Sequence, residues 1–411
     1  MDMINSGDTA WVLTSSALVM LMTPGLAFFY GGMVRRKNIL GVLMQCFTIL
    51  GILSIQWVLF GYSLSFGPGN PFIGGLSWAG LNGVGLEPYA DYSATIPHQA
   101  FMIFQAMFAI ITPALIIGAF AERMKFSAFI VFSLLWATFV YAPICHMVWA
   151  VGGWVRGMGA LDFAGGTVVH INAGIAALVT ALVLGPRVGY QNKPTPLHNI
   201  PFTVLGAALL WFGWFGFNAG SALAANGLAA NAFVTTNTAA AAAGLSWAFL
   251  EWKCSGKPTM FGMVTGAVAG LVAITPAAGF VNVMAAIVIG LLVSVFCFFA
   301  VGFIKPKMGY DDSLDAFGVH GIGGTWGAIA TGLFCTKAVN SAGADGFFYG
   351  NPGQVLIQIK AVVITIVYSF IVTFIIAKVV DLVMGLRVNN EEEIMGLDLT
   401  QHHERAYTIL D

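Results

Sequence analysis

The feature that most constrains this chain is the recurrence of long apolar stretches. A helix that crosses the hydrocarbon core of a bilayer needs about 20 consecutive apolar residues, and stretches of that length follow one another through the sequence. Only 9% of the residues are charged and 58% are hydrophobic, whereas soluble domains carry roughly 25% charge. A soluble fold could not cover its surface with so few charges. We therefore predict an all-α integral membrane protein.

The apolar stretches define the predicted domain organisation. Lipid offers no hydrogen-bond partners, so each crossing segment must satisfy its own backbone, as a helix does. We predict a membrane domain over residues 1–386 and a polar cytoplasmic C-terminal tail over 387–411. The predicted transmembrane helices lie near residues 9–33, 39–66, 98–120, 127–150, 164–185, 199–222, 232–251, 259–278, 280–304, 316–336 and 355–385, which makes eleven.

Positive charges in the short loops predict the orientation. With the N-terminus outside, the outer loops carry only Arg156 and Lys337, against eleven Lys or Arg residues in the inner loops. Cytoplasmic loops are enriched in these residues, so we expect a multi-pass protein of the cell (inner) membrane with a cytoplasmic C-terminus. No secretory signal is expected, because no basic segment precedes the first apolar stretch. The inner-loop cations are Arg35, Arg36, Lys37, Arg123, Lys125, Arg187, Lys193, Lys253, Lys257, Lys305 and Lys307.

A faint internal repeat divides the chain into two halves. Val169-His170 in the fifth predicted helix corresponds to Val319-His320 in the tenth, and the sequence ITPA occurs at both 111–114 and 274–277. Because each half holds five helices, an odd number, the halves must have inverted topology. Inverted repeats place a transport site at their interface, near the middle of the membrane.

Two histidines, His170 and His320, lie deep in apolar helices. An ionisable residue at membrane depth is a functional hypothesis by default, although a single histidine is as often a neutral residue hydrogen-bonded to a neighbouring helix. Two at matching repeat positions favour function. They are too few to hold a metal ion, so we expect no metal and no other cofactor. The longest basic run, Arg35-Arg36-Lys37, is too short to indicate nucleic-acid binding.

Aromatic residues cluster near the predicted outer ends of several helices. Spacings of three and four residues place the members of each group on one helix face. Any single ring fits an interfacial aromatic belt, whereas rings that face one another form a cation–π site, worth about 2 kcal/mol or more when desolvated. The residues are Phe104 and Phe108, Trp149 at the end of the fourth helix, and Trp214, Phe217 and Ser221 in the sixth.

Acidic residues precede both histidine-bearing helices. Asp162 stands directly before the glycine-rich start of the fifth helix, where an N-cap that satisfies unpaired backbone donors is the favoured interpretation. It would also make the outer vestibule negative. Asp311, Asp312 and Asp315 stand before the tenth helix and indicate a helix start, and Asp315 is the one that we expect to face the inner pore mouth.

Six motifs resemble the ammonium transporter family, which includes the Amt, Mep and Rh proteins. The resemblance runs from about residue 8 to 407 and is strongest to the bacterial and archaeal Amt branch. The motifs are FFYGGMVRRKN at 28–38, AFAERMKFS at 119–127, LDFAGGTVVHINAG at 161–174, WFGWFGFNAGS at 211–221, DAFGVHG at 315–321 and GLRV at 385–388.

This resemblance implies eleven helices per subunit, a homotrimer with one pore in each subunit, and ammonium or methylammonium as substrate. It also implies that a PII-type regulatory protein docks at the cytoplasmic face, near Asp315 and the tail. By position, it implies an ammonium site at Phe108, Trp149 and Ser221; a gate of Phe108 with Phe217, or of Phe104 below Phe217; a pore lined by His170, His320 and Trp214; and a structural aspartate at Asp162.

Transport through such a pore requires the substrate to lose its charge. Moving an ion bare through an apolar passage costs tens of kcal/mol by idealised estimates, whereas ammonia is neutral. We expect ammonium to deprotonate near the gate and ammonia to pass the histidines. Proton relay by the two rings would make transport electrogenic. A passive ammonia channel would carry no net charge.

Other classes of function fit the sequence less well. An ammonium sensor acting through a PII-type partner stays open as an alternative, because the short tail carries no signalling domain of its own. A transporter of larger substrates would need charged groups near the middle of the membrane. An enzyme is not expected, since no nucleophile–base pair, metal cluster or phosphate-binding loop is present.

Overall fold

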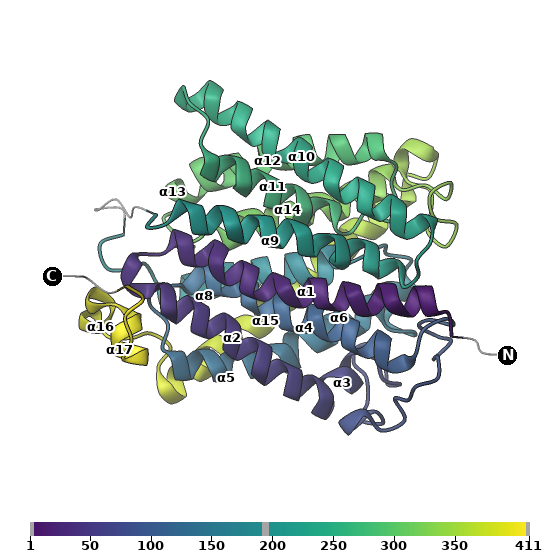
Figure 1. Cartoon of the computed structure of the whole chain (residues 1–411), viewed down its shortest axis with the longest axis horizontal. Helices are drawn as coiled ribbons and strands as arrows, with labels where there is room; N and C mark the ends of the chain where they lie inside the picture. The colour runs from purple at the N-terminus through teal and green to yellow at the C-terminus, as the bar shows by residue number, and fades with distance from the viewer. Residues whose placement is uncertain (1–3, 191–196, 408–411) are drawn as a thin grey trace.

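The computed structural model describes residues 4–190 and 197–407, which form a bundle of helices that run mostly along one axis (Figure 1). Lys193 and the last four residues of the predicted tail lie outside the described residues. Within the described ranges the only β-pairing is three isolated bridges between residue pairs. The prediction of an all-α protein is confirmed.

Eight helices of the described chain are long and apolar enough to cross a membrane. The other three predicted segments are also helical, at Gly227–Ser255, Met260–Ile274 and Phe317–Phe334, but they are shorter or less apolar. A protein with many membrane spans is therefore shown, and the count of eleven remains a prediction. The eight are Ser6–Met33, Arg36–Phe66, His98–Phe120, Phe126–Gly157, Gly166–Leu184, Ile200–Ala222, Val283–Met308 and Gly353–Met384.

Short π-helical or 3-10 segments interrupt many of these helices. The α-helices are α1 (Ser6–Met33), α2 (Ile39–Gln56), α3 (Tyr62–Phe66), α4 (His98–Phe120), α5 (Phe126–Trp136), α6 (Ala142–Trp149), α7 (Trp154–Gly157), α8 (Asn172–Leu184), α9 (Ile200–Ala219), α10 (Gly227–Ser255), α11 (Met260–Ile274), α12 (Val283–Phe299), α13 (Lys305–Met308), α14 (Ile322–Phe334), α15 (Gly353–Met384), α16 (Asn390–Met395) and α17 (Leu397–His402). The π-helices are η2 (Trp57–Gly61), η4 (Ala137–Tyr141), η5 (Gly166–Ile171), η7 (Ala300–Ile304) and η8 (Phe317–Gly321). The 3-10 segments are η1 (Arg36–Asn38), η3 (Ala79–Leu81), η6 (Gly220–Ala222) and η9 (Phe347–Tyr349).

Helices α1 and α9 pack along each other in the middle of the bundle (Figure 1). Their backbones touch at glycines: a Cβ atom on Gly206 of α9 would lie 2.1 Å from the backbone nitrogen of Phe29 in α1. In lipid, where apolar burial gives helices no reason to associate, small residues that permit close backbone approach stabilise such pairs. This contact holds in place the face of α1 that lines the central cavities described below.

Buried ion pairs join the loops at the end of the bundle that holds α16 and α17. The Glu122 side chain is fully buried and lies 2.9 Å from Arg35 Nε and 3.1 Å from Arg187 Nη1. Arg187 Nη2 in turn lies 2.8 Å from Asp311. Burial raises the pKa of Glu122, but Arg187 and Arg35 outweigh it and hold that pKa below its usual range. The loops after α1, α4, α8 and α13 are thereby fixed to one another.

The chain after α15 packs against the same end of the bundle, opposite the end where α1 begins (Figure 1). The Asp398 carboxylate accepts a hydrogen bond from the Gly41 backbone N–H at 2.9 Å, and the Leu397 N–H donates to Asn38 at 2.8 Å. Arg387 pairs with Glu393 at 2.8 Å. The predicted tail is therefore folded onto the start of α2.

We predict that Gly206→Ala destabilises the protein. The added methyl overlaps the α1 backbone, and overpacking of this kind lowers the free energy of unfolding by about 1–3 kcal/mol. Thermal unfolding in detergent, followed by circular dichroism, measures the change. Gly51→Ala in α2 is the control, because no atom lies within 4 Å of the position that its Cβ would take; equal midpoints for the two variants would contradict the close contact.

Candidate functional site

A cavity of about 170 Å³ opens at the end of the bundle where α1 begins. It brings together the three residues expected to recruit the substrate: Phe108 from α4, Trp149 from the end of α6 and Ser221 from η6. The Phe108 and Trp149 rings are perpendicular, with centroids 5.7 Å apart. The Trp149 ring N–H donates to the Asp162 carbonyl at 2.9 Å, which fixes the orientation of the indole.

Four polar residues on this cavity were not singled out from the sequence: Asp91, Tyr92, Gln105 and Arg156. Gln105 lies between Phe104 and Phe108 in α4, and its buried side-chain oxygen has no hydrogen-bond partner within the described chain. An amide side chain in the middle of an apolar stretch was the sequence feature that could have identified Gln105 as a cavity residue. Asp91 and Tyr92 come from a loop, and Arg156, considered above only for its charge, comes from the four-residue α7. Such short or irregular segments have no periodic pattern to indicate which way a side chain points.

Phe108 and Phe217 separate this outer cavity from the interior. Their ring centroids lie 4.4 Å apart, and their exposed fractions are 1% and 0%. Phe108 lines the outer cavity and Phe217 lines the next one. Phe104 packs against Phe108 at 5.0 Å but lines neither cavity, because its ring is turned toward Gly220. Of the two expected gate pairs, the geometry therefore favours Phe108 with Phe217.

His170 and His320 lie together beyond these phenylalanines. Their rings are nearly parallel, with centroids 5.3 Å apart, and both line an apolar cavity of about 10 Å³, roughly the volume that holds one water molecule. The buried nitrogens of His170 and the Nδ1 of His320 have no protein hydrogen-bond partner within the described chain. They are therefore available to a small molecule that donates or accepts a hydrogen bond.

Trp214 completes the wall of the central cavity. Its ring stacks on His170 at 5.4 Å, and its N–H donates to the Thr275 hydroxyl at 2.9 Å. That bond turns the polar edge of the indole away from the histidine and leaves the apolar face against it. Trp214 therefore lies in the wall of this cavity, and its place in a transport pore remains a prediction.

Each histidine lies in a π-helical segment, His170 in η5 and His320 in η8. A π-helical segment is rare and is found frequently at functional sites. A carboxylate precedes each histidine by the same eight residues, Asp162 in one case and Asp312 in the other. The two segments thus share both the π-helical geometry and the spacing to a preceding carboxylate.

Asp162 caps η5. Its carboxylate oxygens accept from the backbone N–H groups of Gly165, Gly166 and Thr167 at 2.8, 2.6 and 2.8 Å, and from Val168 at 3.2 Å. It also accepts from the Thr167 hydroxyl. The expected capping role is therefore what the geometry displays. Because its backbone carbonyl binds Trp149, one residue positions both the outer cavity and the helix that carries His170.

Asp312 caps η8 in the same way. Its fully buried carboxylate accepts from the Ala316 and Phe317 N–H groups at 3.1 and 2.8 Å. Burial raises the pKa of Asp312 to about 6, although Lys305 opposes the shift. Sequence reasoning assigned this residue to a helix start without recognising it as the counterpart of Asp162. The equal spacing to the histidine was the signal that could have identified it.

The two histidine-bearing helices touch at a pair of glycines. A Cβ atom on Gly174 of α8 would lie 2.2 Å from the backbone nitrogen of Gly321 in η8. No larger residue fits at Gly174 unless the helices separate. The distance between the imidazole rings therefore depends on contact between the two backbones.

A third cavity, of about 20 Å³, lies on the other side of His320 and includes Asp315. The Asp315 carboxylate pairs with Lys305 at 2.6 Å and its side chain is 21% exposed. Asp315 thus lies at the end of the row of cavities that is opposite Trp149. That it faces the inner mouth of a pore remains a prediction. Within the described part of the chain, no group of three or more His, Cys, Asp or Glu side chains is arranged to hold a metal ion.

Comparison with known proteins assigns the family. A model described as the Ammonium Transporter Family matches residues 10–407. The chain belongs to the ammonium transporter family. It is 59% identical to the ammonium transporter of Bacillus subtilis over 98% of both chains, and 52% identical to ammonium transporter Amt1 of Archaeoglobus fulgidus over 98% of this chain and all of that one. The resemblance inferred from the six motifs is confirmed.

Solved structures of the family share the fold. Candida albicans Mep2 superposes with a TM-score of 0.90 at 36% identity, covering 98% of this chain and 90% of that one. A protein named as a sensor Amt protein superposes with a TM-score of 0.89 at 30% identity, covering 96% and 98%. The relatives are named for transport rather than catalysis, which supports the expectation that this chain is not an enzyme.

We predict that Asp162→Ala both destabilises the protein and abolishes transport. The substitution leaves four buried backbone donors without their charged acceptor, which costs about 3 kcal/mol or more. It also releases Trp149 and η5 together. Thermal unfolding and ammonium uptake into proteoliposomes measure the two effects. Asp345→Ala, which removes a carboxylate from the loop before α15, is the control; equal losses in both variants would show that Asp162 has no special role.

Proposed function

We propose that this ammonium transporter recruits the ammonium ion in the outer cavity. The Phe108 and Trp149 rings offer cation–π stabilisation, and the Ser221 hydroxyl is a polar group in the same wall. The Ser221 hydroxyl donates to the Phe217 carbonyl at 2.8 Å, so its oxygen lone pairs are available to accept from the cation. The unpaired oxygen of Gln105 is a second acceptor in this cavity.

The central step in the proposal is that the ammonium ion loses a proton where it meets Phe108 and Phe217, either to water of the outer cavity or to the pair His170 and His320. The passage beyond them is apolar and about as large as one water molecule, so it offers too little water to solvate a charge. A charged group in such a medium is strongly destabilised, whereas neutral ammonia is not. Potassium cannot lose its charge and is excluded for the same reason.

The observation that carries the proposal is the stacked pair His170 and His320. A neutral imidazole offers one donor and one acceptor, and the buried ring nitrogens without protein partners can bind ammonia as it passes. The two nitrogens of an imidazole can accept and donate a proton in turn, so the pair can also relay the released proton, separately from ammonia. In that case net charge crosses the membrane and transport is electrogenic.

Several finer features belong to the same proposal. We propose eleven spans with the N-terminus outside the cell membrane and the C-terminus in the cytoplasm, and the placement of α1's start and of α17 at opposite ends of the bundle supports an odd number (Figure 1). The equal spacing from Asp162 to His170 and from Asp312 to His320 supports inverted five-helix repeats. We also propose a homotrimer, methylammonium as a substrate analogue, and a PII-type partner at the face with Asp315 and the folded tail.

A sensor role is the second candidate. The similarity to a structure named as a sensor Amt protein supports it. A sensor would bind ammonium in the outer cavity and signal through a PII-type partner without flux. Measured ammonium transport by the purified chain would exclude a role in sensing alone.

We predict that His170→Leu and His320→Leu each reduce ammonium-evoked current about tenfold or more. Leucine removes a buried hydrogen-bonding partner, which costs about 1–3 kcal/mol, and it cannot relay a proton. Electrophysiology on solid-supported membranes with reconstituted protein measures the current, with potassium as the competing cation. His403→Asn in the tail is the control, since asparagine tolerates the positive φ of 56° at that position.

The alternatives give different results in the same measurement. Undiminished current in both leucine variants would rule out the relay. Uptake without current in the unmodified protein would indicate a passive ammonia channel. Equal currents with potassium and ammonium would contradict deprotonation at the phenylalanine pair.

A further inference from the structure

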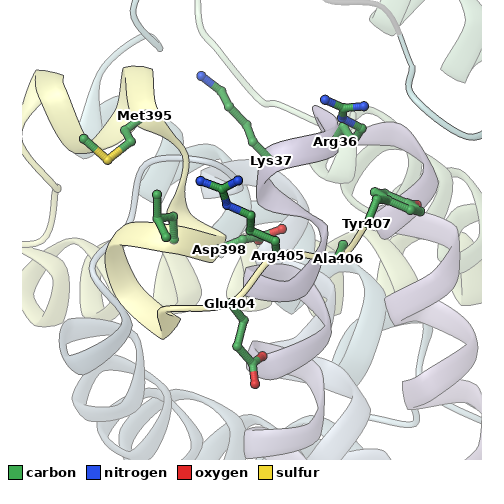
Figure 2. A pocket seen from close by; sticks show the side chains of 9 residues that line it. Arg36, Lys37, Met395, Asp398, Glu404, Arg405, Ala406 and Tyr407 are labelled. Carbon is green, nitrogen blue, oxygen red and sulfur yellow. The ribbon is translucent and has the colours of Figure 1, made fainter. Parts of the chain in front are cut away.

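A fourth cavity lies far from the histidines, where the tail packs on the loop between α1 and α2. It has a volume of about 310 Å³, within the usual range of small-ligand sites. Two segments from opposite ends of the sequence form it, η1 on one side and α17 with the chain that follows on the other (Figure 2). Its walls are Arg36, Lys37, Met395, Asp398, Leu399, Glu404, Arg405, Ala406 and Tyr407.

Three cations face this cavity. Arg36, Lys37 and Arg405 extend to the same side of the docked tail, whereas the Glu404 carboxylate points away from them (Figure 2). Within the described chain, neither Arg36 nor Arg405 pairs with a carboxylate, unlike Arg35, Arg187, Lys305 and Arg387 at the same end of the bundle. Lys37 donates only to the Ile394 carbonyl.

The remaining carboxylate, Asp398, compensates little of this charge. It is 3% exposed, and one of its oxygens is occupied by the Gly41 N–H. Burial raises the pKa of Asp398, although the backbone hydrogen bonds from Gly41 and Leu40 oppose the shift. Three like charges gathered on two separate segments repel each other, so an anion between them would stabilise the packed tail.

We propose that this cavity binds a phosphate group, and that the bound phosphate fastens the tail to the loop between α1 and α2. Two guanidinium groups and an ammonium group are the donors that recognise phosphate oxygens, and arginine does so with two parallel hydrogen bonds. The phosphate is either that of a soluble metabolite or that of a lipid headgroup. A lipid headgroup is a possible source because η1 begins three residues after the end of α1, a helix long and apolar enough to cross a membrane, and basic residues next to such a helix attract anionic lipids.

The site is connected to the transport path through α1. Met22, Leu26 and Phe29 of this helix line the central cavity, and Arg36 and Lys37 follow at its end. The Tyr407 hydroxyl bonds His198 at 3.0 Å, and His198 in turn bonds the Val34 carbonyl at 2.8 Å. A ligand that holds the tail in place therefore restrains the end of a pore-lining helix.

Binding and tail cleavage together test the proposal on the full chain. Titration of inorganic phosphate and glycerol 3-phosphate into the protein in detergent, by calorimetry, measures the soluble source. Trypsin cleavage after Arg405 in nanodiscs of phosphatidylcholine, with and without phosphatidic acid, measures the lipid source. We expect phosphate, in one of these forms, to bind and to slow the cleavage.

Matched variants separate a built site from general attraction of anions. Arg36→Ala should weaken phosphate binding about tenfold, the effect of removing one charged bidentate contact, and should remove the protection from trypsin. Lys307→Ala, which removes an exposed cation from α13 at the same end of the bundle, should change neither. Binding of soluble phosphate identifies a metabolite, and protection by phosphatidic acid alone identifies a lipid. The proposal would be overturned if the unmodified protein showed neither phosphate binding nor protection from trypsin. Equal losses in the Arg36→Ala and Lys307→Ala variants would also overturn it.

Discussion

The capping of η5 by Asp162 is the interaction on which the site depends. In a water-poor interior, backbone N–H groups at a helix start must find acceptors inside the protein, and a single carboxylate satisfies four of them. The same residue holds Trp149 through its carbonyl. The outer cavity with Trp149 and the helix that carries His170 are therefore positioned by one residue. Asp312 caps η8, the segment that carries His320, in the same way.

The cavities along this path differ in the groups that line them. The outer cavity carries polar side chains, and beneath it the buried rings of Phe108 and Phe217 are in direct contact. Beyond these rings, the central cavity is lined by apolar side chains and by the two histidines. Because the rest of the wall is apolar, the unpaired ring nitrogens of the histidines have no competing hydrogen-bond partner in the described chain.

The sequence predicted those helices and cavity residues that a periodic pattern or a family motif indicates. Long apolar stretches gave the helices, and the positions of His170, His320, Trp149 and Phe217 followed from helix faces and family motifs. Loop residues such as Asp91 and Tyr92 were missed, because the sequence of a loop does not indicate which way its side chains point. The packing of Asp398 on Gly41 was also missed, since a contact between opposite ends of the chain leaves no periodic signal.

The glycine crossing at Gly174 and Gly321 has a consequence for how the family can diversify. The spacing of the imidazoles is set where two main chains touch, at a position that only glycine fits. Apolar side chains around the rings can therefore be exchanged over evolutionary time without moving them. Variation in rate or selectivity among relatives should accordingly arise at the two mouths of the pore, while its centre keeps one geometry.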